Sequence, residues 1–145
     1  MTSQARQLIA GSCVAIALAF GAIATATAQE APMPQQQLLG DVAYLNGGAG
    51  DEEVQYIRQS MKEYTLALAF ARAGSPRAEY VASVSVTIKD ARGQTVFELP
   101  SVGPYLLVKL PPGRYSVVAI YNDATQTRPV SVGKTGGPLV TFTWK

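Results

Sequence analysis

The chain has 145 residues, with 12 Lys and Arg against 10 Asp and Glu, no histidine and one cysteine. A chain of this length suits a single domain with its own core. The nearly balanced charge argues against nucleic acid or an anionic lipid surface as the main partner. The lack of histidine excludes a conventional histidine zinc site and Ser-His or Cys-His nucleophile pairs, so we expect no metal and no cofactor.

The N-terminal segment has the three parts of a secretory signal peptide. Arg6 supplies a positive start, Leu8 to Ile23 is an apolar run, and Ala26-Thr-Ala28 is a small-x-small cleavage site. We predict cleavage between Ala28 and Gln29, with residues 1–28 as the signal. The mature protein would then be periplasmic or secreted.

The alternative is an uncleaved membrane anchor. The apolar run is short for a full span, however, and Gly11 and Ser12 interrupt it. Cys13 lies inside this segment, so cleavage removes the only thiol. The sequence therefore predicts no membrane span after cleavage, no disulfide and no thiol chemistry.

Residues 29–37 are rich in Gln, Pro and Ala and predict a flexible leader before one domain at 38–145. Leu38 to Leu45 has the apolar character of a short strand. Asn46 to Gly50 is glycine-rich and interrupts that strand.

The stretch from Asp51 to Tyr64 predicts one amphipathic helix. Apolar side chains recur there at steps of three and four, namely Val54, Ile57, Met61 and Tyr64. Asp51 is the predicted N-cap, because its carboxylate suits the free amides at a helix start. The apolar stripe predicts that one face of this helix lies on the rest of the domain.

From Thr65 onward the apolar period changes to two, which is typical of strands. Val84, Val86 and Ile88 alternate with polar residues and predict a half-buried strand. Turn residues recur about every ten positions to the end of the chain, which favours a sandwich over a helical or α/β fold. The prediction is a mainly β fold, an antiparallel sandwich of about seven strands with one added helix before the core strands.

Two motifs carry the most information about the fold. Val86 to Val96 contains an alternating run and the turn Asp90-Ala-Arg-Gly93, and Tyr105 to Val117 contains another run around Pro111-Pro-Gly113. We predict that each motif is a hairpin, the second closed by a type II turn with positive φ at Gly113. The pair resembles the carboxypeptidase regulatory-like domain of the transthyretin-like sandwich group.

This resemblance implies a Greek-key β-sandwich, of the kind often described as a carbohydrate-binding-like fold. It does not imply an activity. The carboxypeptidases that share the name would need zinc held by histidine, and the hydroxyisourate hydrolases of the transthyretin-like group depend on histidines. This chain has none, so we predict that it is not an enzyme.

The aromatic side chains are the candidate ligand contacts, namely Tyr80, Tyr105, Tyr115, Tyr121 and Trp144. Tyr115, Tyr121 and Trp144 share the parity of inward positions and are predicted to lie in the core. Tyr115 resembles a tyrosine-corner residue, with its hydroxyl bound to backbone near the Pro-Pro-Gly turn. Tyr105 and Leu107 have the outward parity, so they are the predicted ligand or partner contacts.

Val118 and Ile120 also have outward parity. Either the predicted helix covers them or a partner does. The helix is the favoured cover, because its apolar stripe needs a surface of its own.

These observations leave three hypotheses about function. The first is a non-enzymatic exported binding or interaction module, with an unknown protein or glycan partner in the cell envelope. The second is carbohydrate or cell-wall glycan binding through an exposed face that includes Tyr105. The third is a hydrolase that uses a pair of carboxylates, and no two acids in the sequence have a recognisable catalytic context.

Overall fold

The computed structural model describes residues 21, 32–74, 76–134 and 136–145. The predicted signal peptide apart from Gly21, its cleavage site between Ala28 and Gln29, and the first residues of the predicted leader lie outside the described residues. Among the residues that are described, no helix has both the length and the apolar character to cross a membrane.

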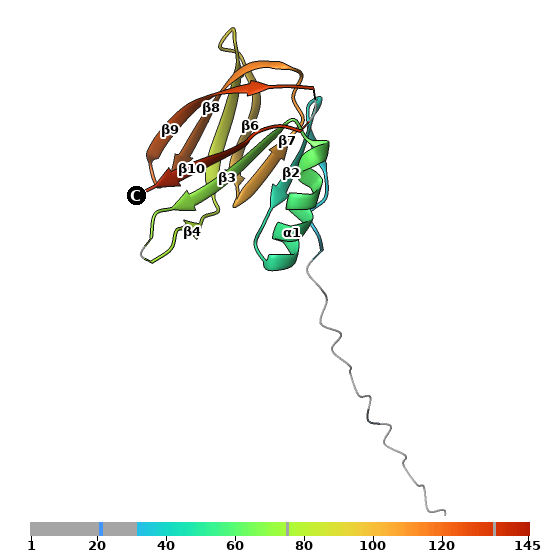
Figure 1. Ribbon diagram of the computed structural model, residues 1–145, viewed down its shortest axis with the longest axis vertical. Helices are drawn as coiled ribbons and strands as arrows, with labels where there is room; N and C mark the ends of the chain where they lie inside the picture. Colours follow the sequence, from blue (N-terminus) through green and yellow to red (C-terminus); the bar gives the residue numbers. More distant parts are fainter. Residues whose placement is uncertain (1–20, 22–31, 75, 135) are drawn as a thin grey trace, which may run out of the picture. The chain divides into compact units, whose positions relative to one another are not determined.

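The described residues form two β-sheets and one α-helix (Figure 1). The larger sheet has the order β1-β2-β7-β3-β10, and β4 pairs with the end of β3. Its strands are β1 (Gln37–Leu39), β2 (Val42–Gly47), β3 (Leu66–Arg72), β4 (Glu79–Tyr80), β7 (Tyr105–Val108) and β10 (Leu139–Trp144). The smaller sheet, in the order β6-β5-β8-β9, contains β5 (Val84–Asp90), β6 (Thr95–Val102), β8 (Gly113–Tyr121) and β9 (Ala124–Val132). The helix α1 (Asp51–Ser60) runs into a 3-10 turn at Met61–Glu63. The predicted fold class, a mainly β sandwich with one helix, is confirmed.

The main core lies between the two sheets. Val84, Val86 and Ile88 on β5 are fully buried, as their alternation with polar residues predicted. From the larger sheet, the rings of Phe70, Phe142 and Trp144 follow one another, with successive centroids 5.8 and 6.2 Å apart. Burial of each large apolar side chain contributes about 1.5–3 kcal/mol, so the core stabilises the fold without a disulfide.

Strand β3 is buried on both faces. Leu66, Leu68 and Phe70 point into the core, whereas Ala67, Ala69 and Ala71 point to the outer side of the larger sheet. Alanine side chains are short, so another element can approach this outer face closely. The Leu/Ala alternation therefore leaves room for a second layer on the outer face of the larger sheet.

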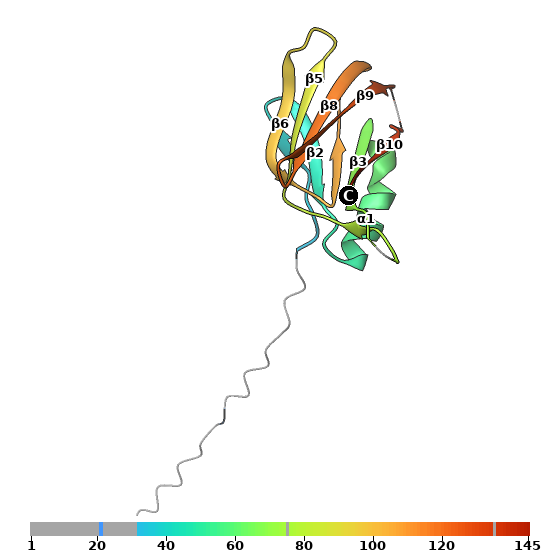
Figure 2. The same ribbon diagram turned by 90° about the vertical axis from the view of Figure 1, so that its left-hand side faces the viewer.

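Helix α1 packs on this outer face of the larger sheet, so the prediction that it covers Val118 and Ile120 is wrong. Figure 2 shows α1 beside the larger sheet, on the side away from β5 and β8. Ile57 lies there in an apolar cluster with Leu107, while Ile120 on the other sheet is 38% exposed. The reason is connectivity: α1 lies in the chain between β2 and β3, which both belong to the larger sheet.

The start of the helix also differs from the prediction. Gly50 is the N-cap and Asp51 is the first helical residue, so no side chain caps the helix. Instead, the Glu53 carboxylate reaches back and accepts hydrogen bonds from the N–H groups of Gly48 and Ala49, at 2.9 and 3.0 Å. Unlike the returning bond of a capping box, which comes from the N-cap residue itself, these bonds come from the two residues before the N-cap, and they fix the loop that enters α1.

The first predicted hairpin is confirmed, and the second is wrong. β5 and β6 pair around the turn at Asp90, whose carboxylate accepts hydrogen bonds from the N–H groups of Arg92 and Gln94. β7 and β8, however, belong to different sheets. The Pro-Pro-Gly segment therefore crosses between the sheets. Gly113 begins β8 with a positive φ, as predicted, but the value of 158° is far from that of a type II turn.

Tyr115 fixes this crossing, as the tyrosine-corner interpretation predicted. Its hydroxyl donates a 2.7 Å hydrogen bond to the Pro111 carbonyl. The Pro111 carbonyl lies in the crossing, outside both sheets, so the Tyr115 hydroxyl is the hydrogen-bond donor that pairs with it.

Replacing Tyr115 with phenylalanine should therefore cost about 1 kcal/mol of stability, since it removes this hydrogen bond and keeps the ring. Urea denaturation measures the change as a lower midpoint at constant slope. Tyr56→Phe is the matched control, because Tyr56 is an exposed residue of α1. Equal midpoints for the two variants would show that the hydroxyl bond does not stabilise the crossing.

One strand pairing departs from the predicted antiparallel pattern. β10 runs parallel to β3, from Leu139 opposite Ala67 to Trp144 opposite Arg72. The chain reaches β10 from β9, which lies in the other sheet. Neighbouring positions in the sequence therefore gave no signal of this pairing. The short strands β1 and β4 account for much of the excess over the predicted seven.

The structured part begins earlier than residue 38. Gln37 belongs to β1, and the Gln36 side-chain oxygen accepts a 3.0 Å hydrogen bond from the Tyr64 hydroxyl. Pro34 lies against Gly47, where an added Cβ would come within 2.6 Å of the proline ring. The structured part of the chain therefore includes the end of the predicted leader.

Candidate functional site

The two predicted contact residues are not on the surface. Tyr105 and Leu107 do point away from the main core, but they are 2% and 0% exposed. Helix α1 covers them, with Val54, Ile57 and Met61 in the same apolar cluster. Their predicted role as exposed contacts is therefore wrong, because parity gives the direction of a side chain and not what lies above it.

Tyr80 is the aromatic residue that reaches solvent beside them. It pairs with Ala71 on β3, and Tyr105 pairs with Ala69, so the two tyrosines occupy successive outer positions along one strand. Their ring centroids are 5.3 Å apart at an angle of 33°. Tyr80 is 56% exposed, so a buried aromatic ring supports an accessible one.

A groove of about 480 Å³ runs between Tyr80 and the helix. Four of its residues come from one face of α1, at helical spacings of three and four. The lining residues are Gly48, Ala49, Gly50, Asp51, Val54, Gln55, Arg58 and Tyr80. Gly48 has φ 106°, and a Cβ there would approach the Tyr105 ring to 2.6 Å. Only glycine lets the loop lie this close to the ring.

The charge in the groove centres on Arg58. Burial raises the pKa of Tyr105 above its usual value, and the neighbouring Tyr80 hydroxyl adds to the rise, while the Arg58 guanidinium opposes it. The raised pKa keeps the Tyr105 hydroxyl neutral beneath Tyr80. Arg58 adds donors, Asp51 adds an acceptor and Gln55 adds both.

This arrangement suits binding. It offers one aromatic face with polar groups of both hydrogen-bonding types around it. No group of three or more His, Cys, Asp and Glu that would hold a metal occurs within the described part of the chain. Asp90 and Glu53 are occupied by backbone N–H groups, and Glu79 pairs with Arg72 at 2.6 Å.

A second hollow, of about 360 Å³, lies at the end of the sandwich. It is lined by Arg72, Tyr121, Asn122, Ala124, Trp144 and Lys145. Trp144 is buried, and its indole N–H donates to the Ala124 carbonyl at 2.9 Å. Trp144 and Tyr121 belong to the core and its border, as predicted, so this hollow offers less free surface than the groove.

The sequence included Tyr80 among the aromatic candidates but did not single it out. A local signal existed in the opposite charges of Arg72 and Glu79, which flank a segment with Gly74 and Pro76. In the structure these two residues pair across β3 and β4 and set Tyr80 on the outer face. The presence of Arg58 in the same groove had no such signal, because it depends on where α1 lies.

Comparison with models of protein families gives no match for this chain, and comparison with curated proteins also gives none. The class that the fold defines is a mainly β sandwich with a helix on its larger sheet.

Proposed function

We propose that this protein is a non-enzymatic, exported binding module whose ligand lies in the groove between α1 and Tyr80. The observation that carries the proposal is the exposed Tyr80 ring, supported by buried Tyr105 and flanked by Arg58. A large exposed aromatic ring in a hollow is a typical contact for a ligand.

Two features support a binding role over catalysis. The chain has no histidine, and Cys13 falls within the proposed signal peptide. The carboxylates of Glu53 and Asp90 have structural partners. A periplasmic or secreted location follows from the proposed cleavage after Ala28.

Of the two motifs behind the proposed resemblance to the carboxypeptidase regulatory-like domain, the β5–β6 hairpin supports it, whereas the second motif crosses between the sheets.

Glycan binding is the second candidate, and Tyr80 is the observation that favours it. A sugar ring stacks its C–H groups on an aromatic face and hydrogen-bonds its hydroxyls to planar polar side chains. Arg58 and Gln55 are such side chains, and both line the groove with Tyr80. The glycan face is thus centred on Tyr80, in place of the Tyr105 of the sequence prediction.

Binding to a panel of glycans and peptidoglycan fragments tests the groove. Tyr80→Ala should weaken the binding of any ligand found by at least tenfold, because stacking and burial on one aromatic ring are worth one to a few kcal/mol. Tyr56→Ala is the matched control, since Tyr56 is exposed on α1 and does not line the groove. An equal loss of affinity in both variants would contradict a binding site in the groove. If no glycan or peptidoglycan fragment of the panel binds, the glycan candidate is removed.

Export is tested separately. The full chain is expressed in a bacterial host, and mass spectrometry measures the molecular mass of the product in the periplasmic, secreted and membrane fractions. A periplasmic or secreted product that starts at Gln29 supports the proposal. A full-length product held in the membrane would overturn it. Crosslinking in the native envelope then identifies the partner.

A further inference from the structure

The smaller sheet carries a pair of cations that the groove does not involve. Lys89 on β5 is opposite Ser116 on β8, and Arg114 is opposite Ser131 on β9. Ile88 and Tyr115 point toward the core side, so by alternation Lys89 and Arg114 both point outward. Diagonal neighbours on adjacent strands are about 7–8 Å apart, so two long cationic side chains share one patch.

Within the described residues, no carboxylate forms an ion pair with Lys89 or Arg114. The one ion pair in the described part of the chain joins Arg72 and Glu79. Asp90 is nearest in sequence to Lys89, but its carboxylate accepts from the turn amides. Glu98 lies on β6 opposite Thr87, so it is near Lys89 on the same outer face but two strands from Arg114. Arg114 therefore has no outward-facing carboxylate on its own strand or on the neighbouring strands β5 and β9.

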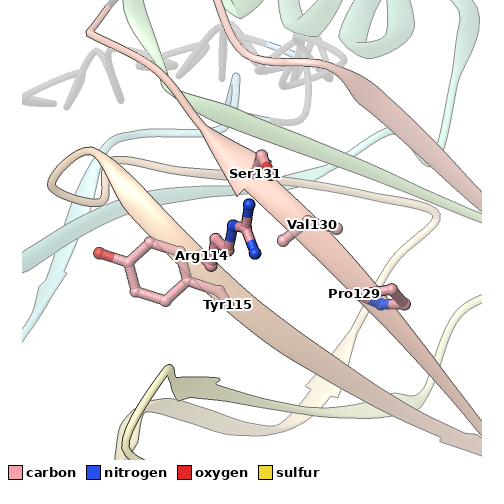
Figure 3. A pocket seen from close by; sticks show the side chains of 5 residues that line it. All are labelled: Arg114, Tyr115, Pro129, Val130 and Ser131. Carbon is pink, nitrogen blue, oxygen red and sulfur yellow. The ribbon is translucent and has the colours of Figure 1, made fainter.

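A hollow lies beside Arg114. It has a volume of about 270 Å³ and is lined by Arg114, Tyr115, Pro129, Val130 and Ser131. Figure 3 shows the Arg114 guanidinium directed along β9 toward Ser131. The guanidinium and the serine hydroxyl are both donors, and Ser116 provides a second hydroxyl on the same face.

We propose that this patch is a binding site for a phosphate group, with Arg114 at its centre. Guanidinium binds phosphate oxygens in pairs, and an ammonium group adds a point charge. Donors come from three adjacent strands, which matches the several oxygens of a tetrahedral phosphate better than the two of a carboxylate. The site lies on the opposite sheet from the groove and is independent of the proposed groove ligand.

The phosphate could belong to a soluble molecule or to a lipid headgroup, and the experiment separates these sources. The purified protein is titrated with inorganic phosphate and followed by amide NMR signals, with sodium chloride at equal ionic strength as the reference. A second arm measures sedimentation with vesicles of phosphatidylglycerol and phosphatidylcholine, against vesicles of phosphatidylcholine alone.

We expect saturable shifts at residues 114, 116 and 131 with phosphate and not with chloride. Arg114→Gln should weaken this binding at least tenfold and Lys89→Gln about threefold. Arg77→Gln, an exposed loop change, is the matched control and should leave binding unchanged. All three side chains are exposed, and a preserved NMR spectrum verifies the fold of each variant.

Saturable phosphate binding that depends on Arg114, without sedimentation, assigns the site to soluble phosphates. Sedimentation with phosphatidylglycerol that Arg114→Gln abolishes assigns it to a lipid headgroup. Equal effects of chloride and phosphate, or wild-type binding by Arg114→Gln in both arms, would overturn the proposal.

Discussion

Replacing Ile57 with aspartate is expected to lower the stability of the protein by at least about 3 kcal/mol. Ile57 is fully buried between α1 and the outer face of the larger sheet. An aspartate there either buries an unpaired carboxylate or forces the helix off the sheet. The second outcome exposes Tyr105 and Leu107, so both routes are costly.

Urea denaturation separates the two routes. A lower midpoint with an unchanged slope indicates that the helix stays docked, and a smaller slope indicates that the native state already exposes the outer face. Gln59→Asp is the matched control, because Gln59 is an exposed position in the same helix. It should change stability by less than about 0.5 kcal/mol. An Ile57→Asp protein as stable as this control would show that α1 does not hold the sheet.

The helix also shows what the sequence alone determines. The spacing of Val54, Ile57 and Met61 predicted a buried face, and the alternation in β7 predicted that Tyr105 and Leu107 point away from Leu106. Both directions are correct. Neither pattern shows that the buried face of the helix contacts the outer face of β7. The short Gly48–Gly50 loop decides this, because it keeps α1 beside β2.

Both candidate sites depend on strand register, which a single sequence specifies only weakly. Tyr80 meets Tyr105 because each pairs with an alanine of β3. Lys89 and Arg114 are diagonal neighbours because β5 pairs with β8 from Ser85 to Asp90. The sequence shows these cations as scattered charges, and only the register makes them neighbours.

The two sheets therefore divide the surface between different chemistries. Helix α1 covers the outer face of the larger sheet, and the groove exists because the helix leaves Tyr80 uncovered. No helix of the described residues lies on the smaller sheet, and its outer face carries short polar side chains around Arg114. A ligand in one site would not displace a ligand in the other.

Gly137→Ala is expected to cost about 3 kcal/mol, through a backbone clash in the native state. A Cβ at Gly137 would overlap the carbonyl group of Thr65. The Gly137 N–H donates to the Tyr64 carbonyl at 3.2 Å, and the next residue, Pro138, accepts from Ala67. The clash therefore falls where β10 first meets β3.

Thr65 cannot yield to relieve this clash. Its buried hydroxyl donates to the Leu110 carbonyl at 2.9 Å and accepts from the Leu110 N–H at 2.7 Å. Gly133→Ala is the matched control, since a Cβ there meets nothing within 4 Å, and its effect should stay within about 0.5 kcal/mol. If thermal denaturation gives the two variants the same stability, the backbone at Gly137 can move away from Thr65 and this contact does not hold β10 against β3. A selective loss in Gly137→Ala instead makes this contact the point that holds the last strand, and with it Phe142 and Trp144, in the core.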